Sequence, residues 1–314
     1  MPNTAPLHLR LPVSFYLQVV ICAALWGSAF PVIKNSYAEL SLNHYGEQLI
    51  FAGSRFFLAG LFVLPFCRGK VLPKLKQAPR GPLIAIVLGQ TYFQYVFFYY
   101  GLNVSTGTLA ALLVGAGSFW WMLLAPLILK TAPPRPVHWV LLACCSLGIA
   151  CAVYQPGSDL QNAGLGAAAF LAASFSGAMA ATFMKKVAPV SGSRTPTAFS
   201  LSTGGLLLLL TAAPFWTQYI ASFNLTTLLV TLYLAFVSAT AFTLWNRLIE
   251  HYSINVLASF RFLIPLMGIL ESTLFIPGEN LRPGLVIGAA VVLSCLVISS
   301  RVKEAPLEGR LIRP

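Results

Sequence analysis

The sequence contains 314 residues, of which 57% are hydrophobic and only 9% are charged, and its mean hydropathy is +0.78. An ordinary soluble domain carries about 25% charged residues, so most of this surface cannot face water. The net charge of +12 does not indicate nucleic acid as a partner, because the basic residues are spread over many short turns instead of forming one groove with interleaved aromatics. We predict an all-α membrane protein.

Ten apolar segments are separated by polar or Pro/Gly breaks. A bilayer core about 30 Å thick needs roughly 20 apolar residues per helix. The predicted spans are, in chain order, 13–33, 48–67, 83–101, 106–128, 137–154, 164–184, 195–215, 225–246, 253–276 and 283–300. The first run is long for a signal peptide and lacks a clean cleavage site, so we interpret it as a retained span.

Basic residues orient these spans, because cytoplasmic turns of membrane proteins are enriched in Lys and Arg. If the N-terminus is cytoplasmic, the outer turns contain only Lys34 and Arg282, while Arg55 and Arg261 lie within spans. All other cations then lie in cytoplasmic segments: Arg10, Arg68, Lys70, Lys74, Lys76, Arg80, Lys130, Arg135, Lys185, Lys186, Arg194, Arg247, Arg301, Lys303, Arg310 and Arg313. We therefore expect a multi-pass protein of the cytoplasmic (inner) membrane with both termini in the cytoplasm.

The ten spans divide into two sets of five, and this odd number makes the second set start from the opposite side of the membrane. An offset of 147 residues aligns Arg135-Pro136 with Arg282-Pro283 at the same turn of each half. We predict two inverted five-helix repeats. The expected organisation is a cytoplasmic N-terminal segment 1–12, a first repeat 13–154, an outer linker 155–163, a second repeat 164–300 and a basic cytoplasmic tail 301–314.

Short motifs run through both halves. The first span and the residue after it contain Ala24–Lys34 (ALWGSAFPVIK), and the second span contains Arg55–Leu61 (RFFLAGL). The second half closes with Pro265, Glu279 and a Gly-rich last span. With these motifs the sequence resembles the EamA-type branch of the drug/metabolite transporter superfamily over essentially its whole length. The resemblance implies ten helices in two inverted repeats around a central cavity. It also implies export or import of amino acids, nucleobase-like compounds, drugs or other metabolites.

We therefore expect a secondary transporter that moves an amino acid or a similar small organic compound across the membrane by alternating access. The resemblance favours export, and a channel-like facilitator or a membrane sensor with the same cavity is the alternative. An enzyme is not expected, because His8, His44, His138 and His251 lie in or beside turns and the acids are not clustered. We expect no cofactor and no metal ion; the substrate and the lipid bilayer are the expected partners.

Three residues of the types that are charged at neutral pH (Asp, Glu, Lys, Arg) lie within the predicted spans: Arg55, Arg261 and Glu271. Each costs about 2.5 to 3.5 kcal/mol at the centre of the bilayer, so each needs a compensating interaction. Arg55 and Glu271 lie at similar depths and could form an ion pair, which would leave Arg261 free for an anionic group such as a substrate carboxylate. In the alternative interpretation the arginines are structural and bond to neighbouring carbonyls.

Polar and aromatic residues in the spans complete the candidate site. Gln90 and Gln94 are four residues apart and would share one helix face near mid-membrane. They could face a cavity or form interhelical hydrogen bonds. The other candidate substrate-binding residues, which could wall the cavity or could be packing and lipid-facing groups, are Trp26, Ser28, Tyr95, Trp120 and Trp245.

Gly284 and Gly288 form a GxxxG step in the last span, which permits close contact between two helices. Packing within the chain is the favoured interpretation. The same step could also join two copies in a homodimer.

Overall fold

The computed structural model describes residues 11–39, 42, 44–104, 113, 115–153, 163–275 and 283–302. Within these ranges every regular element is helical, which confirms the predicted all-α class. The elements are α1 (Val13–Glu39), α2 (Tyr45–Val63), η1 (Leu64–Phe66), α3 (Val71–Gln77), α4 (Arg80–Ile86), η2 (Val87–Phe93), α5 (Gln94–Val104), α7 (Ala116–Leu129), α8 (Pro136–Val153), α9 (Ala163–Ser191), α10 (Arg194–Thr211), η3 (Ala213–Phe215), α11 (Trp216–Ala221), α12 (Leu225–His251), α13 (Ile254–Phe260), α14 (Leu263–Phe275) and α15 (Pro283–Arg301).

Seven helical segments of the described chain are long and apolar enough to cross a membrane: Val13–Ile33, Tyr45–Phe66, Arg80–Val104, Gly164–Ser191, Leu225–His251, Ile254–Phe275 and Pro283–Arg301. The segments Arg194–Thr211 and Ala213–Ala221 make an eighth if they are counted together, although they are bent by 64°. Two shorter apolar helices, Gly117–Leu129 and Pro136–Ala152, coincide with two further predicted spans. The start of the predicted span 106–128 and most of the predicted linker 155–163 lie outside the described residues.

The outer surface of the bundle is apolar. Leu127 is 76% exposed, Leu147 66% and Phe275 67%. Exposed side chains of this kind would destabilise a protein in water, but in a bilayer they contact lipid chains at no such cost. The protein is therefore a membrane protein with several apolar helices.

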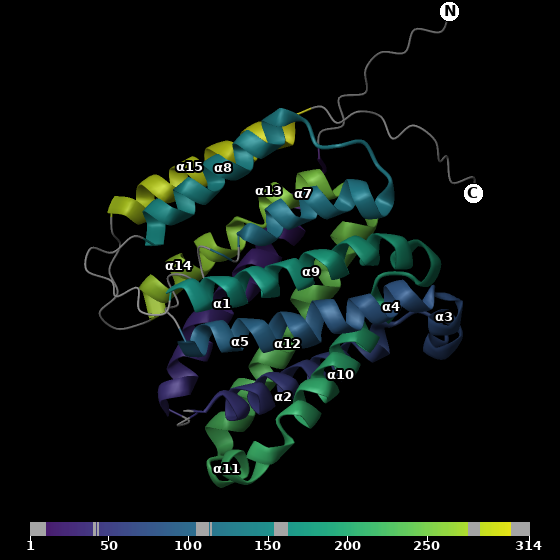
Figure 1. Cartoon of the computed structure of the whole chain (residues 1–314), viewed down its shortest axis with the longest axis vertical. Helices are drawn as coiled ribbons and strands as arrows, with labels where there is room; N and C mark the ends of the chain where they lie inside the picture. The colour runs from purple at the N-terminus through teal and green to yellow at the C-terminus, as the bar shows by residue number, and fades with distance from the viewer. Residues whose placement is uncertain are drawn as a thin grey trace, which may run out of the picture.

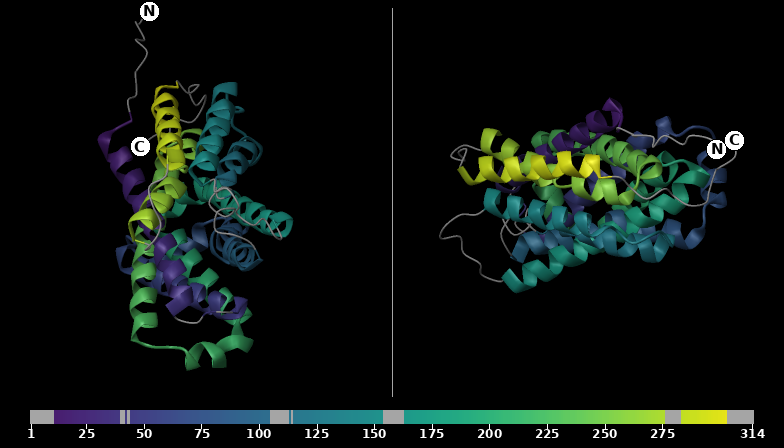
Figure 2. Two further views of the ribbon diagram at one scale, coloured as in Figure 1. Left: turned by 90° about the vertical axis from the view of Figure 1, so that its left-hand side faces the viewer. Right: turned by 90° about the horizontal axis from the view of Figure 1, so that it is seen from above.

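Helices from the two halves of the sequence alternate in space. In Figure 1, α8 and α15 lie side by side at one end of the long axis, while α10 and α11 occupy the other end. Seen from above, most helices run in roughly the same direction (Figure 2). The strongest packing joins a helix of the first half to one of the second: α2 with α10, α8 with α15, α1 with α14, and α5 and α7 with α9. The halves are thus interdigitated.

Glycines allow these close approaches between the halves. A Cβ atom at Gly53 of α2 would lie 2.9 Å from the carbonyl oxygen of Gly205 in α10, so no side chain fits there. Gly288 packs directly on the backbone of Gly148, and Gly284 packs on the Cys151 carbonyl. The GxxxG step of the last span is therefore used within the chain, between α15 and α8.

Two spans are irregular near their middle. In the third span, η2 is a π-helical segment, which accommodates an extra residue in the turn and rotates the side chains that follow it. The ninth span is broken between α13 and α14, because Pro265 lacks an N–H and its ring would clash with the carbonyl of Arg261, four residues earlier. Ile264 N donates to Arg261 O over 3.0 Å instead. Both irregularities border the candidate site.

Candidate functional site

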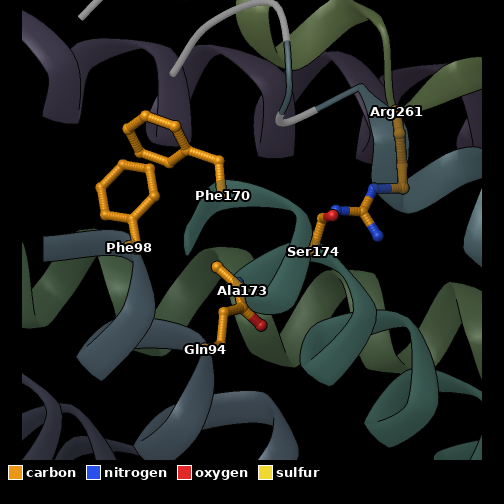
Figure 3. A pocket seen from close by; sticks show the side chains of 6 residues that line it. All are labelled: Gln94, Phe98, Phe170, Ala173, Ser174 and Arg261. Carbon is orange, nitrogen blue, oxygen red and sulfur yellow. The ribbon is translucent and has the colours of Figure 1, made fainter. Parts of the chain in front are cut away.

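A small cavity of about 40 Å³ lies between α5, α9 and the break that separates α13 from α14. Its lining side chains are Gln94, Phe98, Phe170, Ala173, Ser174 and Arg261. Figure 3 shows the two phenylalanines on one side and the guanidinium group of Arg261 on the other, directed toward Ser174 of α9. The cavity has room for a few water molecules, and it brings together two of the predicted site residues, Gln94 and Arg261.

Arg261 lies deep among packed side chains, yet part of its surface remains accessible. Its guanidinium carbon is 4.9 Å from the centre of the Trp121 ring, a cation–π contact. Gly117 of α7 makes room for it, because a Cβ atom there would lie 2.9 Å from Arg261 Nη2. Within the described residues no carboxylate interacts with Arg261. In the described part of the chain, its charge is therefore compensated by the aromatic rings of Trp121 and Tyr95.

Gln94 is the first residue of α5, directly after the π-helical segment. Its amide packs over Gly177 of α9, where any Cβ atom would collide with it. The described residues supply no hydrogen-bond partner for this amide, and the side chain is partly accessible. Donor and acceptor groups of Gln94 are thus available to a molecule in the cavity.

Gln90 has a different environment. It is 4% exposed, its Oε1 accepts from Asn246 Nδ2 over 3.0 Å, and its Nε2 donates to Ser200 Oγ over 3.5 Å. The same Asn246 Nδ2 donates to Thr197 Oγ1 over 2.8 Å, so Gln90 belongs to a buried network that joins η2, α10 and α12. The two amides thus have different surroundings, although a regular helix would place them on one face; the π-helical segment η2 ends between them.

Arg55 does not line the cavity; its guanidinium group is buried against aromatic rings. It is 4% exposed, its guanidinium carbon is 4.4 Å from the Phe56 ring centre and 5.4 Å from that of Tyr95, and its Nε has no hydrogen-bond partner. Tyr95 interacts electrostatically with both Arg55 and Arg261, which places this ring near both cations.

The predicted ion pair between Arg55 and Glu271 was wrong. Glu271 is 9% exposed, its Oε2 has no hydrogen-bond partner, and no cation of the described residues interacts with it. The helices explain the failure: α2, which carries Arg55, packs mainly against α10 and α12, whereas α14 packs mainly against α1. Equal depth in the membrane does not make two helices neighbours.

Three tryptophans, Trp121, Trp245 and Trp26, form a chain of ring contacts that begins at Arg261. Trp121 stacks on Trp245 at 6.2 Å between ring centres, and Trp245 meets Trp26 edge-on at 5.7 Å. Trp26 and Trp245 therefore connect to Arg261 through Trp121. Trp120, the predicted candidate, instead contacts Phe175 of α9 at 5.3 Å.

Ser28 is the remaining candidate. It shares a hydrogen bond of 2.7 Å with the hydroxyl of Tyr233 in α12 and donates to Leu25 O over 2.9 Å. It does not line the cavity.

The sequence analysis did not single out Trp121 or the cavity residues Phe98, Phe170 and Ser174. One signal could have found the last three. Phe98 lies four residues after Gln94, and Phe170 lies four before Ser174, so each pair shares a helix face. Nothing in the sequence distinguishes the adjacent Trp120 and Trp121, since only the rotation of α7 decides which ring faces Arg261.

Comparisons with known proteins find transporters that match nearly the whole length of this chain. The sequence profile of the EamA-like transporter family matches residues 13–154 and again residues 164–301. A "Probable amino-acid metabolite efflux pump" of Salmonella typhimurium is 26% identical over 291 residues, covering 89% of this chain and 92% of that protein. A protein of Escherichia coli with the same description is 25% identical over 295 residues, covering 89% and 92%.

Two further similarities concern a transporter and a solved structure. "Uncharacterized transporter YvbV" of Bacillus subtilis is 26% identical over 308 residues, covering 93% of this chain and 94% of that protein. A solved structure, described as "Crystal structure of protein", superposes with a TM-score of 0.71 at 16% identity, over 91% of this chain and 96% of the other. At that identity the superposition shows a shared fold.

Proposed function

Because the chain belongs to the EamA-like transporter family, we propose that it is a secondary transporter that exports an amino acid or a similar small organic compound. The substrate would cross the cytoplasmic membrane by alternating access of its binding site to the two sides. The direction and the substrate class rest on two relatives that are described as probable amino-acid metabolite efflux pumps.

The observation that carries this proposal is the cavity between the interdigitated halves, where the side chains of Arg261 and Gln94 have no hydrogen-bond partner among the described residues. Gln94 directly follows the π-helical segment η2, and Arg261 lies at the break between α13 and α14. Discontinuous helices supply the binding sites of many secondary transporters. A ligand pocket usually encloses about 300 to 1,000 Å³, far more than the present cavity of about 40 Å³. We infer that this conformation is closed and that the cavity widens when the halves move.

We further propose ten spans in two inverted five-helix repeats with both termini in the cytoplasm. The family profile supports two repeats because it matches each half once. Contacts between basic turns support their grouping on one side of the membrane: Arg194 Nη1 donates to Phe66 O over 3.2 Å, and Lys185 Nζ donates to Ile249 O over 2.7 Å. The turns after the second, sixth and eighth spans therefore lie at one end of the bundle, as cytoplasmic turns must.

Counterflow in proteoliposomes tests the mechanism. Vesicles are preloaded with an unlabelled compound from a panel of amino acids and N-acetyl amino acids, and entry of the same labelled compound is followed. A carrier produces a transient, saturable accumulation that protein-free vesicles lack. Entry that only equilibrates and does not saturate would identify a channel-like facilitator and overturn the carrier.

A further inference from the structure

Among the described residues that line the cavity, one carries a positive charge and none carries a negative charge. We propose that its ligand is an organic carboxylate with an apolar body and no free ammonium group, bound through its carboxylate by Arg261. This inference rests on the proposed function and narrows the substrate class of the same site.

The charges of the lining residues favour an anionic ligand. Of the 6 side chains that line the cavity, Arg261 is charged, Gln94 and Ser174 are neutral and polar, and none is a carboxylate. Arg55 adds a second buried cation nearby, and Glu271 interacts with neither arginine. An uncompensated guanidinium inside the membrane is unfavourable. An anionic ligand would neutralise it, and a carboxylate matches its planar, bidentate donor geometry.

The same charges disfavour a zwitterion. The ammonium group of a free amino acid would be withdrawn from water without a carboxylate to receive it, since the lining offers only the neutral oxygens of Gln94 and Ser174. Burial of an unpaired charge costs far more than burial of a hydrogen-bonded neutral group. An acylated nitrogen removes this cost because it is neutral.

The remaining lining residues fit the other parts of such a ligand. Phe98 and Phe170 form an edge-to-face pair with ring centres 5.8 Å apart, on the opposite side of the cavity from Arg261 (Figure 3). They offer an apolar surface for a hydrophobic side chain. Gln94 lies below both ends in Figure 3, beside Ala173, and its amide has no hydrogen-bond partner among the described residues, so it can both donate to and accept from an acylamide group.

Three related probes separate the chemical groups: N-acetyl-L-phenylalanine, L-phenylalanine and L-phenylalaninamide. Binding to purified full-length protein is measured by isothermal calorimetry and by thermal unfolding, since a ligand that binds the folded state raises its stability. We expect N-acetyl-L-phenylalanine to bind at least tenfold more tightly than L-phenylalanine. L-Phenylalaninamide, which lacks the carboxylate, should not bind measurably.

Variants assign the effect to one side chain. Arg261→Gln should abolish binding of N-acetyl-L-phenylalanine, and Arg261→Lys, which keeps the charge without the planar fork, should weaken it at least tenfold. Arg80→Gln removes an exposed arginine at the start of α4 and should bind like the parent protein. If Arg261→Gln does not fold, the Arg261→Lys variant still decides the question.

The outcomes distinguish this inference from the proposed function. Equal affinity for the acetylated and free amino acid, or unchanged affinity in Arg261→Lys, would overturn the carboxylate site, while saturable counterflow of free amino acids would leave the transporter standing. Binding of N-acetyl-L-phenylalanine without counterflow of any compound would support the carboxylate site and overturn the transporter.

Discussion

Two glutamines in one span illustrate how strongly the local environment decides the role of a residue. Gln90 is held by Ser200 and Asn246 in a buried network, whereas the amide of Gln94 packs over Gly177 and faces the cavity. Their side chains are chemically identical and only four residues apart. Substitution of each should therefore affect a different property of the protein.

Gln94→Leu should weaken ligand binding about two- to tenfold, the effect of losing one neutral hydrogen bond of about 0.5 to 1.5 kcal/mol, while the thermal stability of the unliganded protein is unchanged. Gln90→Leu should instead lower the free energy of unfolding by about 1 kcal/mol, because Asn246 and Ser200 lose an interhelical partner. Calorimetry and thermal unfolding of both variants check this contrast. Loss of stability in Gln94→Leu with unchanged affinity would show that this amide is a packing group.

At the scale of the helices, contacts between the ends of elements connect distant parts of the chain. Lys185 of α9 donates to three carbonyl oxygens at the end of α12, Ile249 O, Glu250 O and Tyr252 O, over 2.7, 3.1 and 2.8 Å. The last carbonyls of a helix have no partner within it, and they carry the negative end of its dipole. A lysine at this position therefore caps α12 and ties it to α9.

Lys185→Met should consequently lower the free energy of unfolding by about 1.5 to 3 kcal/mol, the range for hydrogen bonds that involve a charged group, and so lower the melting temperature of the purified protein. The matched control is Lys186→Met, which removes the same charge from the next residue, an exposed lysine near the ring of Phe183. Thermal unfolding of the two variants under one condition gives the comparison. Equal shifts in both would mean that net charge, and not the cap on α12, determines the effect.

For the whole molecule, the interdigitated halves place the basic turns at one end of the bundle. Arg194 reaches Phe66 O, Ser193 N donates to Glu250 Oε2 over 3.2 Å, and Lys185 reaches the end of α12. These contacts join the turns after the second, sixth and eighth spans, which the distribution of cations assigned to the cytoplasm.

Cysteine labelling tests this orientation. In a variant without the six native cysteines, a cysteine at Asp159, which lies outside the described residues, should react with a membrane-impermeant maleimide in intact cells. A cysteine at Val190, which is 51% exposed near the end of α9, should react only after permeabilisation. Val190 is preferable to Gly192, whose φ of +71° would strain any other residue. The reverse labelling pattern would contradict cytoplasmic termini.

The sequence alone determined the all-α class, the positions of most helical segments among the described residues, and the unusual arginines within them. Hydropathy and charge are local properties, and a bilayer selects for them residue by residue. The expectation that Arg261 lacks an acidic partner also came from the sequence, although it assumed an Arg55–Glu271 pair that does not form. The structure agrees with it within the described residues.

The tertiary structure alone decided which helices are neighbours and which way each side chain points. Close packing at glycines brings α2 to α10 and α14 to α1, which separates Arg55 from Glu271 although both were expected at the same depth. The rotation of α7 directs Trp121 rather than Trp120 toward Arg261. Gln90 bonds to Asn246 of α12, whereas Gln94 packs on Gly177 of α9, although the two are four residues apart. Each of these results depends on contacts between segments far apart in the chain, and such contacts leave no local pattern in the sequence.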